Sequence, residues 1–437
     1  MKKFFKTISN IFSIEELRTR ILNTLGFLIV FRLGSFITLP GIDPSKLVDN
    51  AGGIFGLLDT FLGGAFSNAS IFGLGIMPYI SASIVLQLLT VAVPYFQKLQ
   101  KEGDSGRKKI SQITRLLTLF ICMAQSAAYL TTISAEAIVI NGFFFRISSM
   151  IMLTAGTVFC MWLGEKITDK GIGNGISMLI MIGIISRFPA SIVAEAMSRG
   201  MSQMLFFFIE MLALFFVVMA TVALVQAIRK IPVQYAKQVV GNKVYGGQRQ
   251  YIPLKVNSSG VMPIIFAQSL MFLPAMIGGI WAENSVTAQW VVATFSRVES
   301  WQYSLLFACL IIVFTFFYTA ITINPTQISD DMKRNGGFIP GIKPGKQTSE
   351  FIDGILSRIT LPGSVFLAII ATLPAFAILG GVGRGFAQFY GGTSLLIMVG
   401  VILDTLQQVE SYLLMRHYEG MMKSGRVRGR SQSTVVA

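Results

Sequence analysis

Ten apolar runs divide this sequence, and they limit its possible folds more than any other feature. An α-helix needs about 20 apolar residues to cross a bilayer, and most of the runs reach or approach that length. Only 13% of the 437 residues are charged and 53% are hydrophobic, which is too little polar surface for a soluble protein. We therefore predict an all-α polytopic membrane protein with ten transmembrane helices. The runs are residues 21–39, 71–93, 116–133, 147–163, 176–188, 204–228, 260–281, 304–323, 360–379 and 393–414.

The basic residues predict the orientation of these spans. If both termini and every second loop lie on one side of the membrane, that side collects most of the 36 Lys and Arg residues. By the positive-inside rule this side is the cytoplasm, so both termini are expected there. The net charge of +15 is then mainly a signal of topology. It does not by itself indicate nucleic-acid binding.

The stretch Leu58–Pro94 does not fit one ordinary span. Its second half is long and apolar enough to cross the membrane, but Leu58–Ser70 is shorter, is interrupted by Gly63 and Gly64, and carries Asp59. Irregular backbone at membrane depth is tolerated only inside protein or beside water. The stretch therefore predicts a half-inserted segment against the mouth of an interior cavity, as in a channel.

An internal repeat supports the same interpretation. The pattern G-x-M-P-x-I opens the second span at Gly75–Ile80 and the seventh span at Gly260–Ile265. Because the copies are five spans apart, an odd number, they would have opposite topology. Inverted repeats place a pathway at their interface. A chance match of six residues is the alternative.

Enzyme chemistry finds little support in the sequence. The single histidine, His417, follows the last span, and the chain has no GxxxxGK[ST] loop for ATP. We expect no catalytic residue, metal or cofactor. The charges Arg32, Glu210 and Asp404 lie within spans, and intramembrane charge is typical of ion-coupled transporters. A secondary transporter is therefore the alternative to a channel, and a membrane enzyme is a third class.

Two loops on the predicted cytoplasmic side are longer than a connection between two spans requires. Residues 229–256 are basic and aromatic, with a Gly-Asn turn that predicts a protruding hairpin, and residues 324–350 are rich in Gly and Pro. Loops of this length are usually functional or disordered. They face either lipid headgroups or an acidic partner or RNA backbone.

Six segments carry motifs of one known family. They are residues 73–90 (GLGIMPYISASIVLQLLT), 101–115 (KEGDSGRKKISQITR), 161–177 (MWLGEKITDKGIGNGIS), 251–267 (YIPLKVNSSGVMPIIFA), 335–348 (NGGFIPGIKPGKQT) and 391–405 (GGTSLLIMVGVILDT). Together they closely resemble the SecY family, the channel subunits of the bacterial secretory translocon. The resemblance extends over nearly the whole chain.

This resemblance implies an architecture and a function. Two inverted five-helix halves, residues 1–200 and 201–437, would enclose a central hourglass pore that opens sideways to lipid. The chain would be a passive protein-conducting channel of the bacterial plasma membrane, which translocates unfolded preproteins and releases transmembrane segments laterally. The implied partners are the SecE and SecG subunits, the motor ATPase SecA, the ribosome, preproteins and membrane lipid.

The resemblance also implies roles for single residues. The pore ring falls on Ile76, Ile80, Ile176, Ile180, Ile265 and Ile397, although each alone is equally an ordinary packing residue. The plug, about residues 59–72, contains Asp59, Phe61, Leu62, Gly63, Gly64, Phe66 and Asn68. The polar residues of the lateral gate are Gln87, Gln125, Gln268 and Ser269. Motor or ribosome docking falls on loops 229–256 and 324–358, with Arg229, Lys230, Lys237, Lys243, Lys255, Lys333, Arg334 and Lys343.

One docking residue departs from the family pattern. The family usually has arginine where this chain has Lys343. Lysine keeps the positive charge but lacks the two-pronged hydrogen-bonding geometry of a guanidinium. The contact geometry at this turn is therefore expected to differ.

Overall fold

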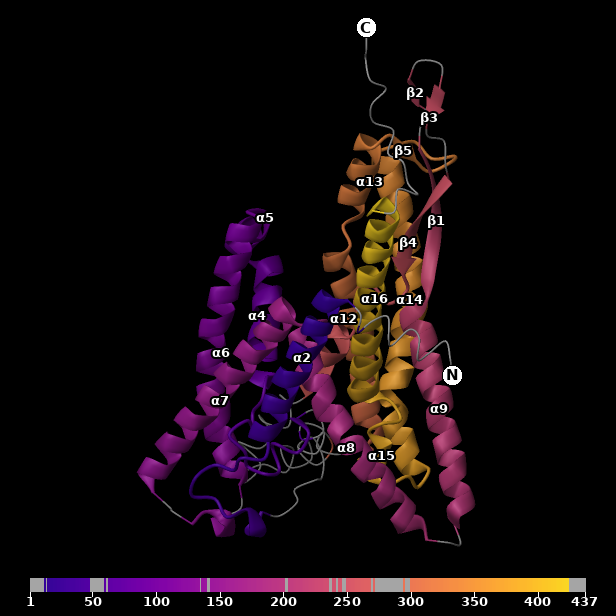
Figure 1. Ribbon diagram of the computed structural model, residues 1–437. Coiled ribbons are helices and arrows are strands. Elements are labelled where there is room, and N and C mark those ends of the chain that lie inside the picture. Colours follow the sequence, from indigo (N-terminus) through magenta and orange to yellow (C-terminus); the bar gives the residue numbers. More distant parts are fainter. Residues whose placement is uncertain are drawn as a thin grey trace.

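The computed structural model describes residues 12, 14–47, 59, 62–133, 135–139, 142–200, 203–235, 238–240, 243–245, 249–268, 270–271, 294 and 299–423. These residues are mainly helical, which confirms the predicted all-α class (Figure 1). The helices are α2 (Glu15–Gly34), α4 (Met77–Ala92), α5 (Pro94–Lys101), α6 (Asp104–Thr132), α7 (Phe143–Lys170), α8 (Gly175–Arg199), α9 (Met204–Gln226), α12 (Trp301–Thr322), α13 (Pro325–Arg334), α14 (Lys346–Leu379), α15 (Arg384–Ala387) and α16 (Gly392–Lys423), with short 3-10 helices at Pro44–Lys46 and Ala135–Ala137.

Several helices have the length and hydropathy of membrane spans. In the described part of the chain seven helical segments meet both criteria: α6, α7, α8, α9, α12 continued by α13, α14 and α16. α4 and α5, which bend by 102° at their junction, count as an eighth if they form one span. The junction is Val93, which Pro94 restricts to an extended conformation. The protein is therefore a multi-pass membrane protein, and the number of ten spans stays a prediction.

Several helices extend beyond the predicted spans, at the ends that carry charged residues. α6 begins at residue 104 instead of 116, α14 begins at 346 instead of 360, and α8 ends at 199 instead of 188. The apolar run stops at the first charged residues, but the backbone hydrogen bonds of a helix do not require apolar side chains. Residues 346–358, predicted as part of a cytoplasmic loop, are therefore the first turns of α14.

The first two apolar runs, in contrast, are only partly helical. Residues 35–39 follow the end of α2, and residues 71–76 precede α4. The backbone N–H of Leu39 donates to the carbonyl oxygen of Ala69 at 2.9 Å. This bond, which lies beside an isolated antiparallel bridge, fixes the segment before α4 against the chain that leaves α2.

The two long loops form a small sheet at one end of the molecule (Figure 1). β1 (Ile228–Tyr235) pairs antiparallel with β4 (Arg249–Lys255), and β2 (Gln238–Val240) pairs with β3 (Lys243–Tyr245), so the predicted protruding hairpin is confirmed. β5 (Gly337–Phe338) comes from the second loop and pairs with β1. The strand order β4-β1-β5 therefore joins the two loops, which the sequence analysis did not predict.

The sheet rests on the first turns of α14. Ile231 and Val233 of β1, Met332 of α13, and Ile352 and Leu356 of α14 are buried in one cluster. Burying an aliphatic side chain of this size contributes about 1.5–3 kcal/mol. The cluster therefore couples both loops firmly to the long helix that enters the membrane.

The helices form two groups, with α8 between them (Figure 1). α2 and α4 to α7 make up the first group, and α9 and α12 to α16 make up the second. α8 contacts α7 and α2 on one side and α16, α15 and α9 on the other. Each group has its own buried cluster, and a third cluster lies where the groups meet.

The two copies of the repeat adopt the same local conformation. Gly75 and Gly260 have φ angles of +50° and +65°, a region that favours glycine. A helix begins two residues later in both copies, at Met77 and at Met262. The pattern is therefore more than a chance match of letters, because each copy breaks the backbone and restarts a helix at the same place.

Candidate channel pore and gate

The predicted ring residues meet in one hydrophobic cluster between the two helix groups. Four of them are buried, and two are partly buried against the others. They come from the beginning of α4, the beginning of α8, the helix that starts at Met262, and α16, so the fold brings four distant segments together. The buried members are Ile76, Ile80, Ile180 and Ile397, and the partly buried members are Ile176 and Ile265.

Such a cluster suits a constriction physically. Aliphatic side chains shed water, so a narrow ring of them resists ion flow, and they offer no hydrogen bond that would retain a sliding chain. α7 supports the ring at Gly164. A Cβ atom at Gly164 would lie 3.1 Å from Cγ1 of Ile176 and 3.5 Å from Cδ1 of Ile76, so glycine lets α7 approach both residues.

Two of the other residues in the cluster lie beside predicted ring residues on the same segments, and the sequence analysis did not name them. Val261 packs against the cluster, partly buried, and holds in the second copy of the repeat the position that Ile76 holds in the first. The repeat could have identified it. Val401 is buried one turn beyond Ile397 on α16. An apolar residue within an apolar run carries no signal that would separate it from its neighbours.

The predicted plug, residues 59–72, is described at residue 59 and from residue 62 onward, where it folds as a compact series of turns that continues to residue 76. Backbone N–H of Asn68 donates to the carbonyl oxygen of Gly64 at 3.0 Å. The Tyr129 hydroxyl of α6 donates to the carbonyl oxygen of Phe66 at 2.7 Å, and the two rings make an edge contact with centroids 4.7 Å apart. The segment is therefore ordered and attached to α6.

Two arginines also hold this segment. The buried Asp59 carboxylate forms an ion pair with Arg187 of α8, and its Oδ1 accepts a hydrogen bond from Ser67 N–H at 2.9 Å. On the other side Nη1 of Arg32, from α2, donates to the carbonyl oxygen of Gly63 at 2.6 Å. The sequence analysis treated Arg32 only as an intramembrane charge and did not single out Arg187.

The plug glycines are required by conformation and by space. Gly63 and Gly64 have φ angles of +62° and +95°, where other residues are strained. A Cβ atom at Gly63 would lie 2.9 Å from the Cα of Gly183 in α8. At Gly75 it would lie 2.2 Å from Cδ2 of Leu62. The segment therefore sits directly against α8 and the beginning of α4.

One hydrogen bond crosses the seam at which the lateral gate is predicted. The Tyr318 hydroxyl of α12 donates to Oε1 of Gln87 of α4. The Tyr318 ring also makes an edge contact with Phe266, with centroids 5.0 Å apart. Gln125 is half-buried on α6. Tyr318 was not among the predicted gate residues, since a tyrosine in an apolar run gives no indication of a partner 231 residues away.

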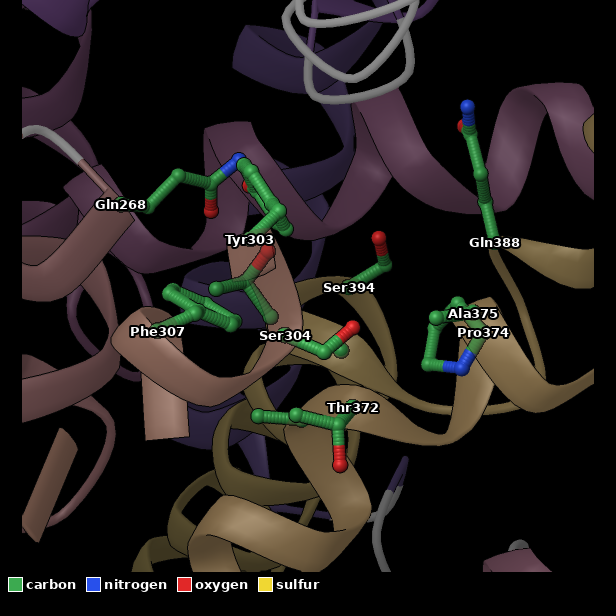
Figure 2. Close-up of a pocket in the computed structure, with 12 residues that line it drawn as sticks. Gln268, Tyr303, Ser304, Phe307, Thr372, Pro374, Ala375, Gln388 and Ser394 are labelled. Atoms are coloured by element: carbon green, nitrogen blue, oxygen red, sulfur yellow. The ribbon is translucent and has the colours of Figure 1, made fainter. Parts of the chain in front are cut away.

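Gln268, another predicted gate residue, lines a small pocket of the second helix group, in which polar and apolar side chains are mixed (Figure 2). Its side chain reaches towards Tyr303, and Ser304, Thr372 and Ser394 contribute hydroxyl groups from α12, α14 and α16. The pocket measures about 30 Å³. A water molecule needs about 10–15 Å³ by the same measure, so the pocket has room for about two or three.

The predicted docking residues that the structure describes lie on the strands of the two loops, on α13 and on the turn before α14, at one end of the molecule (Figure 1). The turn is fixed by Thr348, whose hydroxyl donates to the carbonyl oxygen of Lys343 at 2.9 Å. Lys243 lies in β3, whereas Lys237, like Phe61 and Ser269, lies outside the described residues. The docking residues that are exposed are Arg229, Lys230, Lys255, Lys333, Arg334 and Lys343.

The three charges within spans do not meet. Arg32 binds the plug segment, Glu210 forms an ion pair with Arg199 at 2.5 Å, and Asp404 is exposed on α16. An ion or proton relay needs neighbouring ionisable groups. Among the described residues these three charges form no relay, which disfavours the transporter hypothesis.

Broken helix entrances, a dry aliphatic cluster between two helix groups and an ordered segment against it are the features of a helical membrane channel. Known proteins point to the same class. The family model SecY matches residues 70–406, most of the chain. The chain is 42% identical over 431 residues to the protein translocase subunit SecY of Streptomyces coelicolor, covering 94% of this chain and 98% of that protein. It is 44% identical over 444 residues to the subunit of the same name from Halalkalibacterium halodurans, covering 96% and 100%.

Solved structures share the fold. A protein-conducting channel matches with a TM-score of 0.64 at 15% identity, over 90% of this chain and 92% of that one. Sec61 in the canine ribosome–channel complex from the endoplasmic reticulum matches with a TM-score of 0.60 at 14% identity, with the same coverage. The chain belongs to the SecY family.

Proposed function

We propose that this protein works as the protein translocation channel of the general secretory pathway, and that unfolded preproteins cross the membrane through the isoleucine cluster. One observation carries the proposal. Six isoleucines from four distant segments meet in one cluster between the two helix groups. At rest these residues would exclude water and ions from the constriction, and they would surround a moving chain without forming hydrogen bonds to it.

The proposed mechanism has two openings. Residues 1–200 and 201–437 act as two inverted halves, and the plug, residues 59–72, leaves the pore when a chain enters. Transmembrane segments leave sideways between α4 and α12, where the bond from Tyr318 to Gln87 is the contact to be broken. A hydrogen bond between helices within a membrane contributes about 0.6 kcal/mol of net stabilisation. This bond therefore favours the closed gate but does not prevent it from opening.

The exposed basic end of the molecule supports the proposed docking partners. A curated relative is named as a translocase subunit, and one structural neighbour is described in complex with a ribosome. The exposed Lys and Arg residues on the sheet and α13 suit an acidic protein surface or an RNA backbone. We assign them to SecA and the ribosome, with SecE and SecG as accompanying subunits. The location is a bacterial plasma membrane, with both termini in the cytoplasm.

The test is site-specific crosslinking in lipid vesicles. Cys122, Cys160 and Cys309 are replaced, and single cysteines are introduced at Ile80 or Ile265. The channel is reconstituted with its partner subunits and the motor, and a preprotein is stalled halfway. Crosslinks from the preprotein to both positions are expected, because both face the proposed pore.

A matched control defines the result. Phe216 on α9 is 53% exposed on the outer surface and receives a cysteine in the same background. Crosslinks at the ring positions but not at Phe216→Cys support the proposal. A stalled, protease-protected preprotein without a crosslink at either ring position contradicts it. Saturable uptake of a small solute in place of protein translocation would favour a transporter instead.

A further inference from the structure

Two guanidinium groups from different helices hold the plug at neighbouring residues. Arg32 of α2 donates from Nη1 to the carbonyl oxygen of Gly63 at 2.6 Å, and Arg187 of α8 forms the ion pair with Asp59. A Cβ atom at Gly63 would lie 2.8 Å from Nη1 of Arg32. A Cβ atom at the next residue, Gly64, would lie 3.0 Å from Nη2 of Arg187. These two side chains, the arginine pair, therefore face the same part of the plug.

The charges at this site do not balance. The carboxylate of Asp59 pairs with Arg187, whereas Arg32 forms no ion pair within the part of the chain that the structure describes. Its Cζ lies 4.7 Å from the centroid of the Phe36 ring, and its hydrogen-bond acceptor is a neutral carbonyl group. Two positive charges thus share one negative charge. A partly buried site with an excess of one sign of charge attracts ions of the opposite sign.

Both acceptors belong to the plug, whereas the arginine pair belongs to α2 and α8. Asp59 and Gly63 fall within residues 59–72, the segment proposed to leave the pore when a chain enters. Departure of the plug therefore removes the carboxylate and the carbonyl oxygen together. The two guanidinium groups stay on their helices and border the space that the plug has vacated.

Arg187 continues the line of ring residues along α8, the helix between the two groups (Figure 1). Ile180 and Arg187 are seven residues apart, close to two turns of 3.6 residues, so their side chains share one face of the helix. Ile180 and Ile184 are both buried in the cluster that contains the ring. The rise of 1.5 Å per residue places Arg187 about 10 Å beyond Ile180. In the proposed orientation, a chain that has passed the ring therefore meets the arginine pair.

On the basis of the proposed function, we infer that Arg32 and Arg187 form an anion-binding site of the open channel, which binds the carboxylate groups of a passing preprotein in place of Asp59. A guanidinium can bind a carboxylate through two parallel hydrogen bonds, and Arg187 already binds one carboxylate in the resting channel. The ring itself offers a moving chain no hydrogen bond. An acidic segment is therefore retained beyond the ring for longer than a neutral segment of the same size.

The test measures how fast a stalled preprotein slides back out of the channel. Cys122, Cys160 and Cys309 are replaced, Ile180→Cys is introduced, and the complete complex is reconstituted in vesicles without a membrane potential. A cysteine scan identifies the preprotein residue that crosslinks to Ile180→Cys. Since an extended chain spans about 3.3 Å per residue, the arginine pair lies about three residues further towards the leading end.

A short run of Asp or of Asn is placed at that position or, in a second pair of preproteins, at a position that is already outside the channel. Backsliding is timed by loss of protease protection after the crosslink has been reduced and the ATP of the motor removed. We expect the Asp run at the arginine pair to slow backsliding about threefold relative to the Asn run, as for a partly exposed ion pair. Outside the channel the two runs should behave alike.

Channel variants assign the preference to the arginine pair. Arg187→Gln and Arg32→Gln should each reduce the ratio between the Asp and Asn rates, and Arg187→Lys should keep part of it, because lysine retains the charge without the planar fork. Arg146→Gln, which removes an exposed charge at the start of α7, should leave the ratio unchanged. The ratio compares two preproteins in the same channel, so a loosened plug in a variant affects both equally.

Equal backsliding of the Asp and Asn runs at every position, with the crosslink to Ile180→Cys present, contradicts the inference. A preference that persists when both arginines are replaced also contradicts it. If the preference appears only after chloride is exchanged for a bulky anion such as gluconate, a small anion occupies the site and the carboxylate is not its ligand. Loss of the crosslink would instead show that the proposed function has failed, and the site would fail with it. The unsubstituted arginine pair decides the first outcome, so the test holds even if an arginine variant does not fold.

Discussion

The ion pair between Asp59 and Arg187 predicts that one substitution will release the plug. The Asp59 side chain is 2% exposed and that of Arg187 is 35% exposed. Asp59→Asn removes the negative charge but keeps an oxygen for the N–H of Ser67, which Oδ1 accepts at 2.9 Å. The substitution therefore separates the effect of the charge from that of the hydrogen bond.

The expected loss of stability of the seated plug follows from the exposed fractions of the two side chains. Breaking a fully buried ion pair costs about 3–5 kcal/mol, whereas an exposed pair contributes about 0–1 kcal/mol. Since water reaches Arg187 but hardly reaches Asp59, we expect an intermediate loss of about 2 kcal/mol from plug seating. At 1.4 kcal/mol per factor of ten, the unseated population rises about 30-fold.

The assay is the ion leak of resting channels in vesicles without preprotein or motor. Leak should rise in proportion to the unseated population, about 30-fold in Asp59→Asn by the same conversion. Glu136→Gln removes a charge from an exposed residue of a neighbouring loop and should leave the leak unchanged. Combining Asp59→Arg with Arg187→Asp should recover only part of the seal, because Arg32 binds the adjacent Gly63 and would repel the new arginine.

An unchanged leak in Asp59→Asn, at equal amounts of inserted protein, would refute this reasoning. It would mean that the contacts of Phe66 and Gly63 hold the segment without the ion pair. An equal leak in Asp59→Asn and Glu136→Gln would have the same consequence. Unfolding of the variant could also raise the leak. Measuring the thermal stability of the same samples distinguishes this cause from release of the plug.

Three further predictions concern the gate, the glycine that opens each repeat and the docking end. Tyr318→Phe removes the bond across the seam, worth about 0.6 kcal/mol, and should let a transmembrane segment reach lipid about threefold more readily, as measured by lipid crosslinking. Gly75→Ala should lower the melting temperature more than Gly260→Ala, because both have positive φ but only the first brings Cβ into Leu62. Lys343→Glu should weaken motor or ribosome binding and reduce its salt dependence, whereas Lys343→Arg should not, as measured by binding at several salt concentrations.

Much of the site was predictable because its residues belong to the internal repeat or to motifs of the family. The six isoleucines follow from the family pattern, and the repeat adds Val261 through its match to Ile76. The hairpin of residues 229–256 follows from its turn residues. These features depend on local sequence, which is visible without the fold.

The contacts that join distant segments were not predictable in the same way. Arg187 and Tyr318 find Asp59 and Gln87 only through tertiary packing, and neither has a neighbour in sequence that indicates its partner. The pairing of β5 with β1 involves only two residues of β5, too few to show a strand period. Helix ends beyond the membrane were missed because hydropathy measures lipid contact and not helix continuity.

The length of α14 has a mechanical consequence. Its 34 residues span about 50 Å at 1.5 Å per residue. One end is packed beneath the sheet that carries both docking loops, and the other end borders the turn in which Gly381 accepts a hydrogen bond from Arg199 of α8. A partner bound to the loops, as proposed, would therefore act on one continuous helix of membrane-spanning length, in which Pro362 and Pro374 are the residues that favour a bend. In the proposed orientation, a force applied from the cytoplasm would reach the opposite end of this helix before any chain entered the pore.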